Sequence, residues 1–192
     1  MFKSCLILAV GGLIGLLGIL LLAGYWAGAF NVVHLETTEQ GPYRIAYLDH
    51  PGTYADIAET VLKVEKLLAE QEVAGLAACA LYYGDVRKVP DGDEVGIRGG
   101  YVVERDAEVE PPLEIVEIPR REVLFARFEG HPNIARARIA HDVAQWFDEH
   151  PPEPGRPFIE FFLEGMMEAE VPLVEPSEHG KLDIGGESGG NQ

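Results

Sequence analysis

The chain has 192 residues, enough for one domain and additional segments. It contains 32 acidic and 15 basic residues, which give a formal net charge of −17. Such a charge repels the phosphates of nucleic acids and of anionic lipids, so it argues against a nucleic-acid-binding function. An acidic surface would attract cationic ligands, although keeping the protein in solution is the simpler explanation of the charge.

The N-terminal segment, residues 5–30, contains no charged side chain. About 20 apolar residues span the hydrocarbon core of a membrane, and Tyr25 and Trp26 lie where interfacial aromatic residues are expected. We therefore predict a transmembrane anchor within residues 1–30, with a signal sequence as the alternative. Lys3 precedes the segment and acidic residues follow it, so the positive-inside rule predicts a cytoplasmic N-terminus and an extracytoplasmic domain.

Cysteine and histidine usage predicts neither a disulfide nor a metal site. Cys5 lies in the apolar segment and Cys79 in the domain, so no intramolecular disulfide is expected. No spacing of histidines, cysteines and carboxylates is typical of metal ligands, and we expect no cofactor.

Beyond the apolar segment, turn residues and apolar periodicity divide the chain into alternating elements. We predict a polar connector over 31–41, a strand over 43–49, a helix from 53 to about 72, a strand beginning at 79, its hairpin partner within 94–105, an acidic linker over 106–112, a strand over 123–129, a helix over 134–149, strands over 158–164 and 168–174, and a disordered tail over 176–192.

The order strand, helix, strand, strand occurs twice within a domain over 42–175. His50–Pro51 and His131–Pro132 occupy corresponding places, each after a strand and before an amphipathic helix. The sequence therefore predicts an α+β fold in which duplicated β-α-β-β units form a curved, mostly antiparallel sheet. Both helices would cover one face, and the other face would be free and concave.

One predicted strand, FIEFFLE over 158–164, places a carboxylate between two aromatic rings. Alternation puts Glu160 on one face with Phe158 and Phe162. We expect this to be the free face, where Tyr82 or Tyr83 and Tyr101 would complete an aromatic wall. Aromatic faces around a partly desolvated carboxylate would form a receptor for a cation.

Two other interpretations of these carboxylates remain open. Glu160, Glu168 and Glu170 could lie on a solvated sheet face, as charged residues of one-sided antiparallel sheets usually do. A carboxyl group among aromatic rings could instead act as a general acid or base. No nucleophile accompanies it, because beyond the connector serine occurs only at 177 and 188.

Three stretches resemble the GyrI-like small-molecule-binding domain, which includes the effector-binding domains of multidrug-sensing regulators. They are GPYRIAYLDHPGTY over 41–54, LYYGDVRKVPDGDEVGIRGGYVV over 81–103 and PFIEFFLEGMMEAEVPL over 157–173. The second is most similar to the membrane-anchored branch of the family, which includes a testis-expressed receptor for autophagy of the endoplasmic reticulum.

The resemblance implies roles for particular residues. The family's ligand-binding glutamate corresponds to Glu160, and a second acidic residue to Glu168. Some members resemble hydrolases that open strained rings with such a carboxylate, for which Trp146 would be the aromatic partner. No helix-turn-helix precedes the domain, so regulator function does not carry over. No aromatic residue follows Phe162, so the tail lacks the aromatic hook of an autophagy receptor.

The leading hypothesis is a membrane-anchored module that binds a small cationic or amphipathic ligand. Glu160 would anchor the ligand with help from Glu168, and Tyr83, Tyr101, Phe158 and Phe162 would form the walls. A hydrolase that opens strained electrophilic rings is the second hypothesis. A protein-interaction module without a small ligand is the third.

Overall fold

The computed structural model describes residues 2–26, 28–52, 56–84 and 96–174, with the backbone alone for residues 2–10. The predicted tail over 176–192 lies outside the described residues. The elements are α1 (Phe2–Trp26), β1 (His34–Gln40), β2 (Tyr43–His50), α2 (Ile57–Glu70), β3 (Gly75–Tyr82), β4 (Ile97–Val103), β5 (Glu114–Ile118), β6 (Arg121–Glu129), α3 (Pro132–Glu149), β7 (Glu153–Pro154), β8 (Phe158–Leu163) and β9 (Met166–Val174).

The strands form one large antiparallel sheet in the order β1-β6-β9-β8-β3-β4-β2-β5, with β7 paired to β9. This confirms the predicted α+β class and the antiparallel sheet. Two β-α-β-β units are present, β2-α2-β3-β4 and β6-α3-β8-β9, and they meet where β3 pairs with β8. The sheet is symmetric in its strand order. Read inward from either edge, it has an added strand (β1 or β5), then the first, third and second strands of a unit (β6, β9, β8 or β2, β4, β3).

Strands β1 and β5 differ from the prediction. The residues expected to form the connector over 31–41 contain β1, which pairs with β6 of the second unit. Strand β5 precedes the second unit but pairs with β2 of the first. The sequence HLETTEQ of β1 is polar and only partly buried, because β1 is an edge strand. Backbone pairing with β6, rather than apolar alternation, accounts for this strand.

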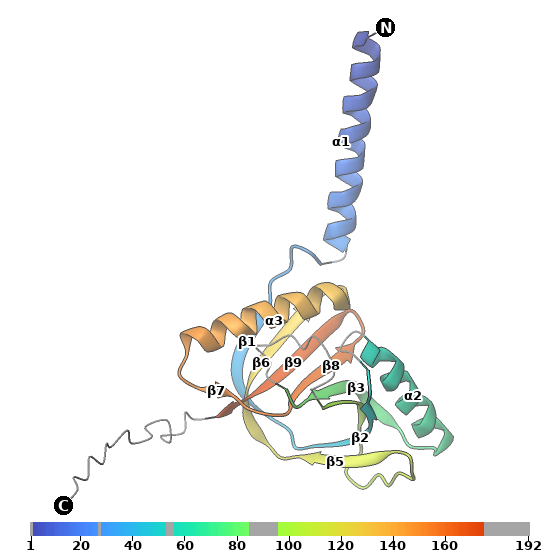
Figure 1. Cartoon of the computed structure of the whole chain (residues 1–192), viewed down its shortest axis with the longest axis vertical. Coiled ribbons are helices and arrows are strands. Elements are labelled where there is room, and N and C mark those ends of the chain that lie inside the picture. Colours follow the sequence, from blue (N-terminus) through green and yellow to red (C-terminus); the bar gives the residue numbers. More distant parts are fainter. Residues whose placement is uncertain (1, 27, 53–55, 85–95, 175–192) are drawn as a thin grey trace, which may run out of the picture.

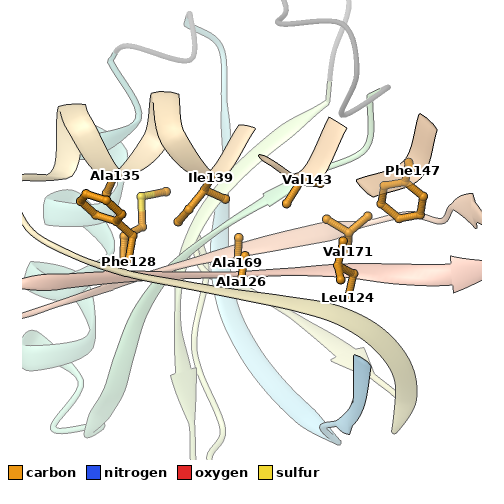
Figure 2. Packing of buried hydrophobic residues seen from close by; sticks show 10 residues of the cluster. Leu124, Ala126, Phe128, Ala135, Ile139, Val143, Phe147, Ala169 and Val171 are labelled. Atoms are coloured by element: carbon orange, nitrogen blue, oxygen red, sulfur yellow. The ribbon is translucent and has the colours of Figure 1, made fainter. Parts of the chain in front are cut away.

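Each long helix of the domain covers its own unit through a 3.6-residue stripe (Figure 1). The stripe of α2 comprises Ile57, Val61, Val64 and Leu68, and that of α3 comprises Ala135, Ile139, Val143 and Phe147. Figure 2 shows the α3 stripe packed on side chains of β6 and β9. Burying one such large apolar side chain contributes about 1.5–3 kcal/mol to folding, so these stripes position both helices.

A cross-strand row shows that both helices lie on the same face of the sheet. Ala126, Ala169, Glu160, Ala80 and Gly99 stand opposite one another on β6, β9, β8, β3 and β4. The α3 stripe packs over the Ala126 end of this row, and the α2 stripe packs over the Ala80 end. Gly99 permits the close approach of α2, because a Cβ there would come within 3.2 Å of the Val61 backbone nitrogen.

The opposite face is not a free concave surface, and this part of the prediction is wrong. Its side chains form a buried cluster that includes Ile45, Leu81, Ile159 and Phe161. The Tyr43 hydroxyl of β2 reaches Glu170 of β9, although four strand pairings separate these strands in the sheet. The sheet therefore curls around this face and encloses it.

Helix α1 extends away from the sheet (Figure 1). Its apolar side chains are exposed, among them Leu13, Ile19, Leu22 and Trp26. Within the part of the chain that the structure describes, no helix has the length and apolar character needed to cross a membrane. The junction after α1 contacts the domain, because the Asn31 amide donates to the Glu129 carbonyl and the Arg138 guanidinium donates to the Ala29 carbonyl.

Candidate functional site

Glu160 is the centre of the candidate site. It lies in the middle of β8 and is only 4% exposed. Its neighbours in the cross-strand row are all alanine or glycine, so it is the only long side chain between β6 and β4 in that row. The row runs beneath both helices. The fold therefore places one carboxylate on the helix-covered face, at the boundary where the two units pair.

Aromatic side chains flank this carboxylate on its own face. Tyr82 of β3 stands opposite Phe158, and their rings stack with centroids 4.4 Å apart. The Tyr82 hydroxyl donates a 2.8 Å hydrogen bond to Glu160 Oε2. On the other side, Phe162 is two residues further along β8. Both phenylalanines are partly buried. Each packs against two buried clusters, one that contains the α3 stripe and one that contains Ile57 and Val61 of α2.

A cation from α3 also faces Glu160. Arg136 Nη2 lies 3.8 Å from Glu160 Oε2, and the two side chains are 25% and 5% exposed, respectively. Removing a carboxylate from water is costly unless hydrogen bonds and opposite charge compensate it. Tyr82 and Arg136 supply both kinds of compensation to the same oxygen. The site thus combines a buried anion, aromatic rings and a cation that reaches solvent.

Four predicted wall and anchor residues share this face: Glu160, Phe158, Phe162 and Tyr101. Tyr101 stands opposite Ala78, which in turn stands opposite Phe162. The prediction placed them on the face without helices, and the structure places them on the face that the helices cover. Apolar residues occupy both faces of β8, so alternation grouped these side chains correctly but could not identify the face.

Glu168 and Tyr83 lie on the opposite face and do not join Glu160. Glu168 accepts a hydrogen bond from Arg127 and forms an ion pair with it, with the Arg127 Nη2 atom 2.6 Å from Glu168 Oε1. The Tyr83 hydroxyl accepts a 3.0 Å hydrogen bond from Arg98, whose guanidinium lies 4.9 Å from the Tyr83 ring centroid. The structure therefore does not bring these two predicted ligand-site residues together with Glu160.

Trp146, the predicted partner for hydrolysis, packs at the other end of α3. Its ring stacks on His150 at 4.2 Å and meets Phe147 edge-on at 5.1 Å. Ten residues separate it from Arg136, which is about 15 Å along a helix axis. Sequence reasoning missed Arg136, and it left Tyr82 as an alternative to Tyr83 before choosing Tyr83. The choice between Tyr82 and Tyr83 depended on strand register, and Arg136 was hidden because it flanks the apolar stripe of α3.

A second buried carboxylate, Glu170 of β9, lies on the enclosed face and is 1% exposed. The Tyr43 hydroxyl donates to its Oε1 atom at 2.6 Å. Within the described residues, Glu170 Oε2 has no hydrogen-bond partner, and neither have Nε and Nη2 of Arg121. Burial raises the pKa of Glu170, although the Tyr43 hydrogen bond and the charge of Arg121 oppose the shift. Burial and the bond to Glu170 likewise raise the pKa of Tyr43.

An open cleft of about 760 Å³ lies at the ends of β2, β4 and β5. Its lining includes Pro42, Tyr43, Arg44, Leu76, Val102 and Ile118. None of Glu160, Tyr82, Phe158, Phe162 and Arg136 belongs to it, so this cleft is separate from the buried carboxylate. Among the described residues, no group of three or more histidine, cysteine or carboxylate side chains is arranged to hold a metal ion.

The family model of the GyrI-like small molecule binding domain matches residues 35–183. No curated protein sequence matches the chain.

Several solved structures share the fold. The C-terminal domain of EcmrR superimposes with a TM-score of 0.62 at 11% identity, covering 75% of this chain and 99% of that one. An integron cassette protein of Vibrio cholerae gives 0.53 at 11% identity, covering 74% and 99%. SAV2435 bound to tetraphenylphosphonium gives 0.52 at 9% identity, covering 73% and 94%. At these identities the likeness concerns the fold alone.

Proposed function

Since the chain belongs to the GyrI-like small molecule binding domain family, we propose that it binds a small organic cation or amphipathic molecule on the helix-covered face, with Glu160 as the anchor. The observation that carries the proposal is a carboxylate, 4% exposed, among the rings of Tyr82, Phe158 and Phe162. Aromatic faces attract cations, and each such contact contributes about 0.5–2 kcal/mol, most where the cation is desolvated.

The arrangement of the helices supports ligand access at Glu160. Helix α2 packs on β2, β3 and β4, whereas α3 packs on β6 and β9. Each helix is thus held by its own unit, and a ligand at the boundary need not disrupt the backbone pairing of the sheet. One relative of the same fold was solved bound to tetraphenylphosphonium, a lipophilic aromatic cation. That compound is therefore the first probe to use.

Calorimetric titration of the full chain with tetraphenylphosphonium tests the proposal. The measurement is made in a neutral detergent, and the titration into detergent alone is subtracted. The Glu160→Gln variant should bind more weakly than the wild type because it loses the charge at the centre of the site. Glu164→Gln is the matched control. It removes the charge of an exposed glutamate four residues after Glu160, so it should bind like the wild type. Equal affinities for both variants would contradict the role of Glu160.

Hydrolysis of a strained electrophile is the second candidate function. It is favoured by the 2.8 Å hydrogen bond between the Tyr82 hydroxyl and Glu160, which joins a carboxylate to a phenol. Turnover of an epoxide by the wild type, abolished in Glu160→Ala, would support this function. Binding without turnover supports the binding module alone. Co-purification of one stoichiometric protein partner, without any small ligand, would instead favour an interaction module.

We also propose that residues 5–30 attach the protein to a membrane, with a cytoplasmic N-terminus and an extracytoplasmic domain. The absence of charge in this segment and the exposed apolar side chains of α1 support the proposal. Retention of the full chain in the membrane pellet after alkaline carbonate extraction is the expected result. Its release into the supernatant would contradict membrane anchoring, and with it the likeness to the membrane-anchored branch. The net charge of −17 supports the further proposal that nucleic acid is not a partner.

A further inference from the structure

The side chain of Arg136 is partly exposed and faces the buried carboxylate, and its Nε atom is buried. Its Nη2 atom is 3.8 Å from Glu160 Oε2, while the Arg136 side chain is five times as exposed as that of Glu160, at 25% against 5%. Arginine has a long aliphatic stem that packs on apolar surface while its head remains in water. The side chain can therefore turn outward without unfolding the helix that carries it.

A ligand cation that approaches Glu160 Oε2 meets the Arg136 charge at the same oxygen. Two like charges within a few ångströms repel, and the repulsion is strong where water is excluded. The Tyr82 hydroxyl is neutral and donates to this oxygen from β3, so its hydrogen bond raises no such conflict. Of these two groups on Oε2, Arg136 is the one with which a cation competes.

We propose that Arg136 is a tethered counter-ion that competes with cationic ligands for Glu160 and thereby sets the selectivity of the site. The inference rests on the proposed binding function. Displacement of Arg136 imposes the same free-energy cost on every cation, whatever its size. Only a cation that also gains contacts with Tyr82, Phe158 and Phe162 offsets that cost. The site therefore favours bulky aromatic cations and rejects small hydrophilic ones such as tetramethylammonium.

The test compares full-length variants by calorimetry with tetraphenylphosphonium and with tetramethylammonium. Arg136→Gln removes the competitor, and it should tighten binding of tetraphenylphosphonium by roughly three- to tenfold, the scale of a partly exposed ion pair. The same variant should bring tetramethylammonium binding closer to the measurable range. Arg136→Lys keeps the charge, so its affinity should lie closer to that of the wild type.

Arg138→Gln is the matched control, because it removes the same charge from an exposed position on the same helix. It should leave both affinities unchanged. An Arg136→Gln variant that folds normally by circular dichroism but binds tetraphenylphosphonium like the wild type would overturn the proposal. An equal gain in Arg138→Gln would also overturn it, by assigning the effect to overall charge.

Failure of the binding function itself gives a different pattern. In that case the wild type, Arg136→Gln and Arg136→Lys all fail to bind tetraphenylphosphonium, and the inference falls with it. Binding by the wild type that Glu160→Gln weakens and Arg136→Gln does not strengthen would leave the function standing and overturn the role of Arg136 alone.

Discussion

Glu160 of β8 and Glu170 of β9 are buried on opposite faces of the same sheet, and their surroundings are chemically alike. Each accepts a hydrogen bond from a tyrosine of the first unit, Tyr82 at 2.8 Å and Tyr43 at 2.6 Å. Each also interacts with the charge of an arginine: Arg136 in the case of Glu160, and Arg121 in the case of Glu170. By composition alone, either carboxylate would qualify as a ligand anchor.

The covering of the two carboxylates differs. Glu160 lies beneath two helices that attach to the sheet through side-chain packing. Glu170 is 1% exposed on the opposite face, where no helix of the described residues packs and where the Tyr43 hydroxyl of β2 contacts its Oε1 atom. On the proposed function, this difference in covering, rather than the residue types present, is what makes Glu160 the ligand anchor and leaves Glu170 a buried polar group.

The strongest test of this difference is ligand affinity. We expect Glu160→Gln to lower tetraphenylphosphonium affinity by about 10- to 100-fold, because a charged interaction contributes about 1.5–3 kcal/mol. Glu170→Gln should leave the affinity within about twofold, a difference under about 0.5 kcal/mol. Calorimetry on both variants checks this. A larger loss in Glu170→Gln would move the binding site to the enclosed face.

Removal of the tyrosine hydroxyls should affect fold stability in the opposite order, with the larger loss at Glu170 and the smaller one at Glu160. Tyr43→Phe takes away the hydrogen bond to Glu170, whose other oxygen already lacks a partner in the described part of the chain, so it should destabilise the fold by about 2 kcal/mol. Tyr82→Phe should cost only about 1 kcal/mol, because Glu160 keeps its ion pair with Arg136. Urea unfolding midpoints measure both. Equal losses would show that the enclosed glutamate is no less well compensated than the other.

The pH dependence of stability should single out Glu170. Burial holds its pKa in the folded state above the ordinary value, so the folded chain binds more protons than the unfolded chain between the two pKa values. The contribution of Glu170 is thus most favourable below its unfolded pKa and is lost as pH rises through the folded one. The slope from one group is at most about 1.4 kcal/mol per pH unit.

Comparison of the wild type with Glu170→Gln by urea unfolding between pH 4 and pH 8 isolates this contribution. The glutamine side chain of the variant does not titrate, so the stability advantage of the wild type should shrink as pH rises. Parallel curves would contradict the raised pKa of Glu170.

The smallest effect is expected at Glu168, the acidic residue that the family resemblance matched to the ligand site. Its ion pair with Arg127 is partly exposed, so Glu168→Gln should change stability by about 0.5 kcal/mol. Tetraphenylphosphonium affinity should not change, because Glu168 faces away from Glu160. A loss of affinity comparable to that of Glu160→Gln would restore the predicted role.

Much of the fold could be predicted from periodicity, and the limits have physical causes. The stripes of α2 and α3 repeat at helical spacing, so both helices were predicted close to their observed positions. Strand β1 was missed because pairing of its backbone with β6 needs no apolar side chains. In β8, Ile159 and Phe161 fill one face while Phe158 and Phe162 occupy the other, so the sequence could not show which face the helices cover.

The site was predicted as a grouping rather than as a set of contacts. Glu160 was singled out as a candidate because a carboxylate between two phenylalanines is conspicuous along one strand. Its partners come from elsewhere in the chain: Tyr82 depends on the register between β3 and β8, and Arg136 depends on where α3 crosses the sheet. Such long-range geometry leaves no local pattern in a single sequence.

The exchange of edge strands has a consequence for how this protein folds. Because β1 completes the second unit and β5 completes the first, each half borrows its outermost strand from the segment that precedes the other half. We therefore expect that neither repeat folds on its own, despite the duplicated pattern. We expect the domain to unfold in one cooperative transition, and a fragment that stops before β6 would expose an unpaired strand edge prone to association.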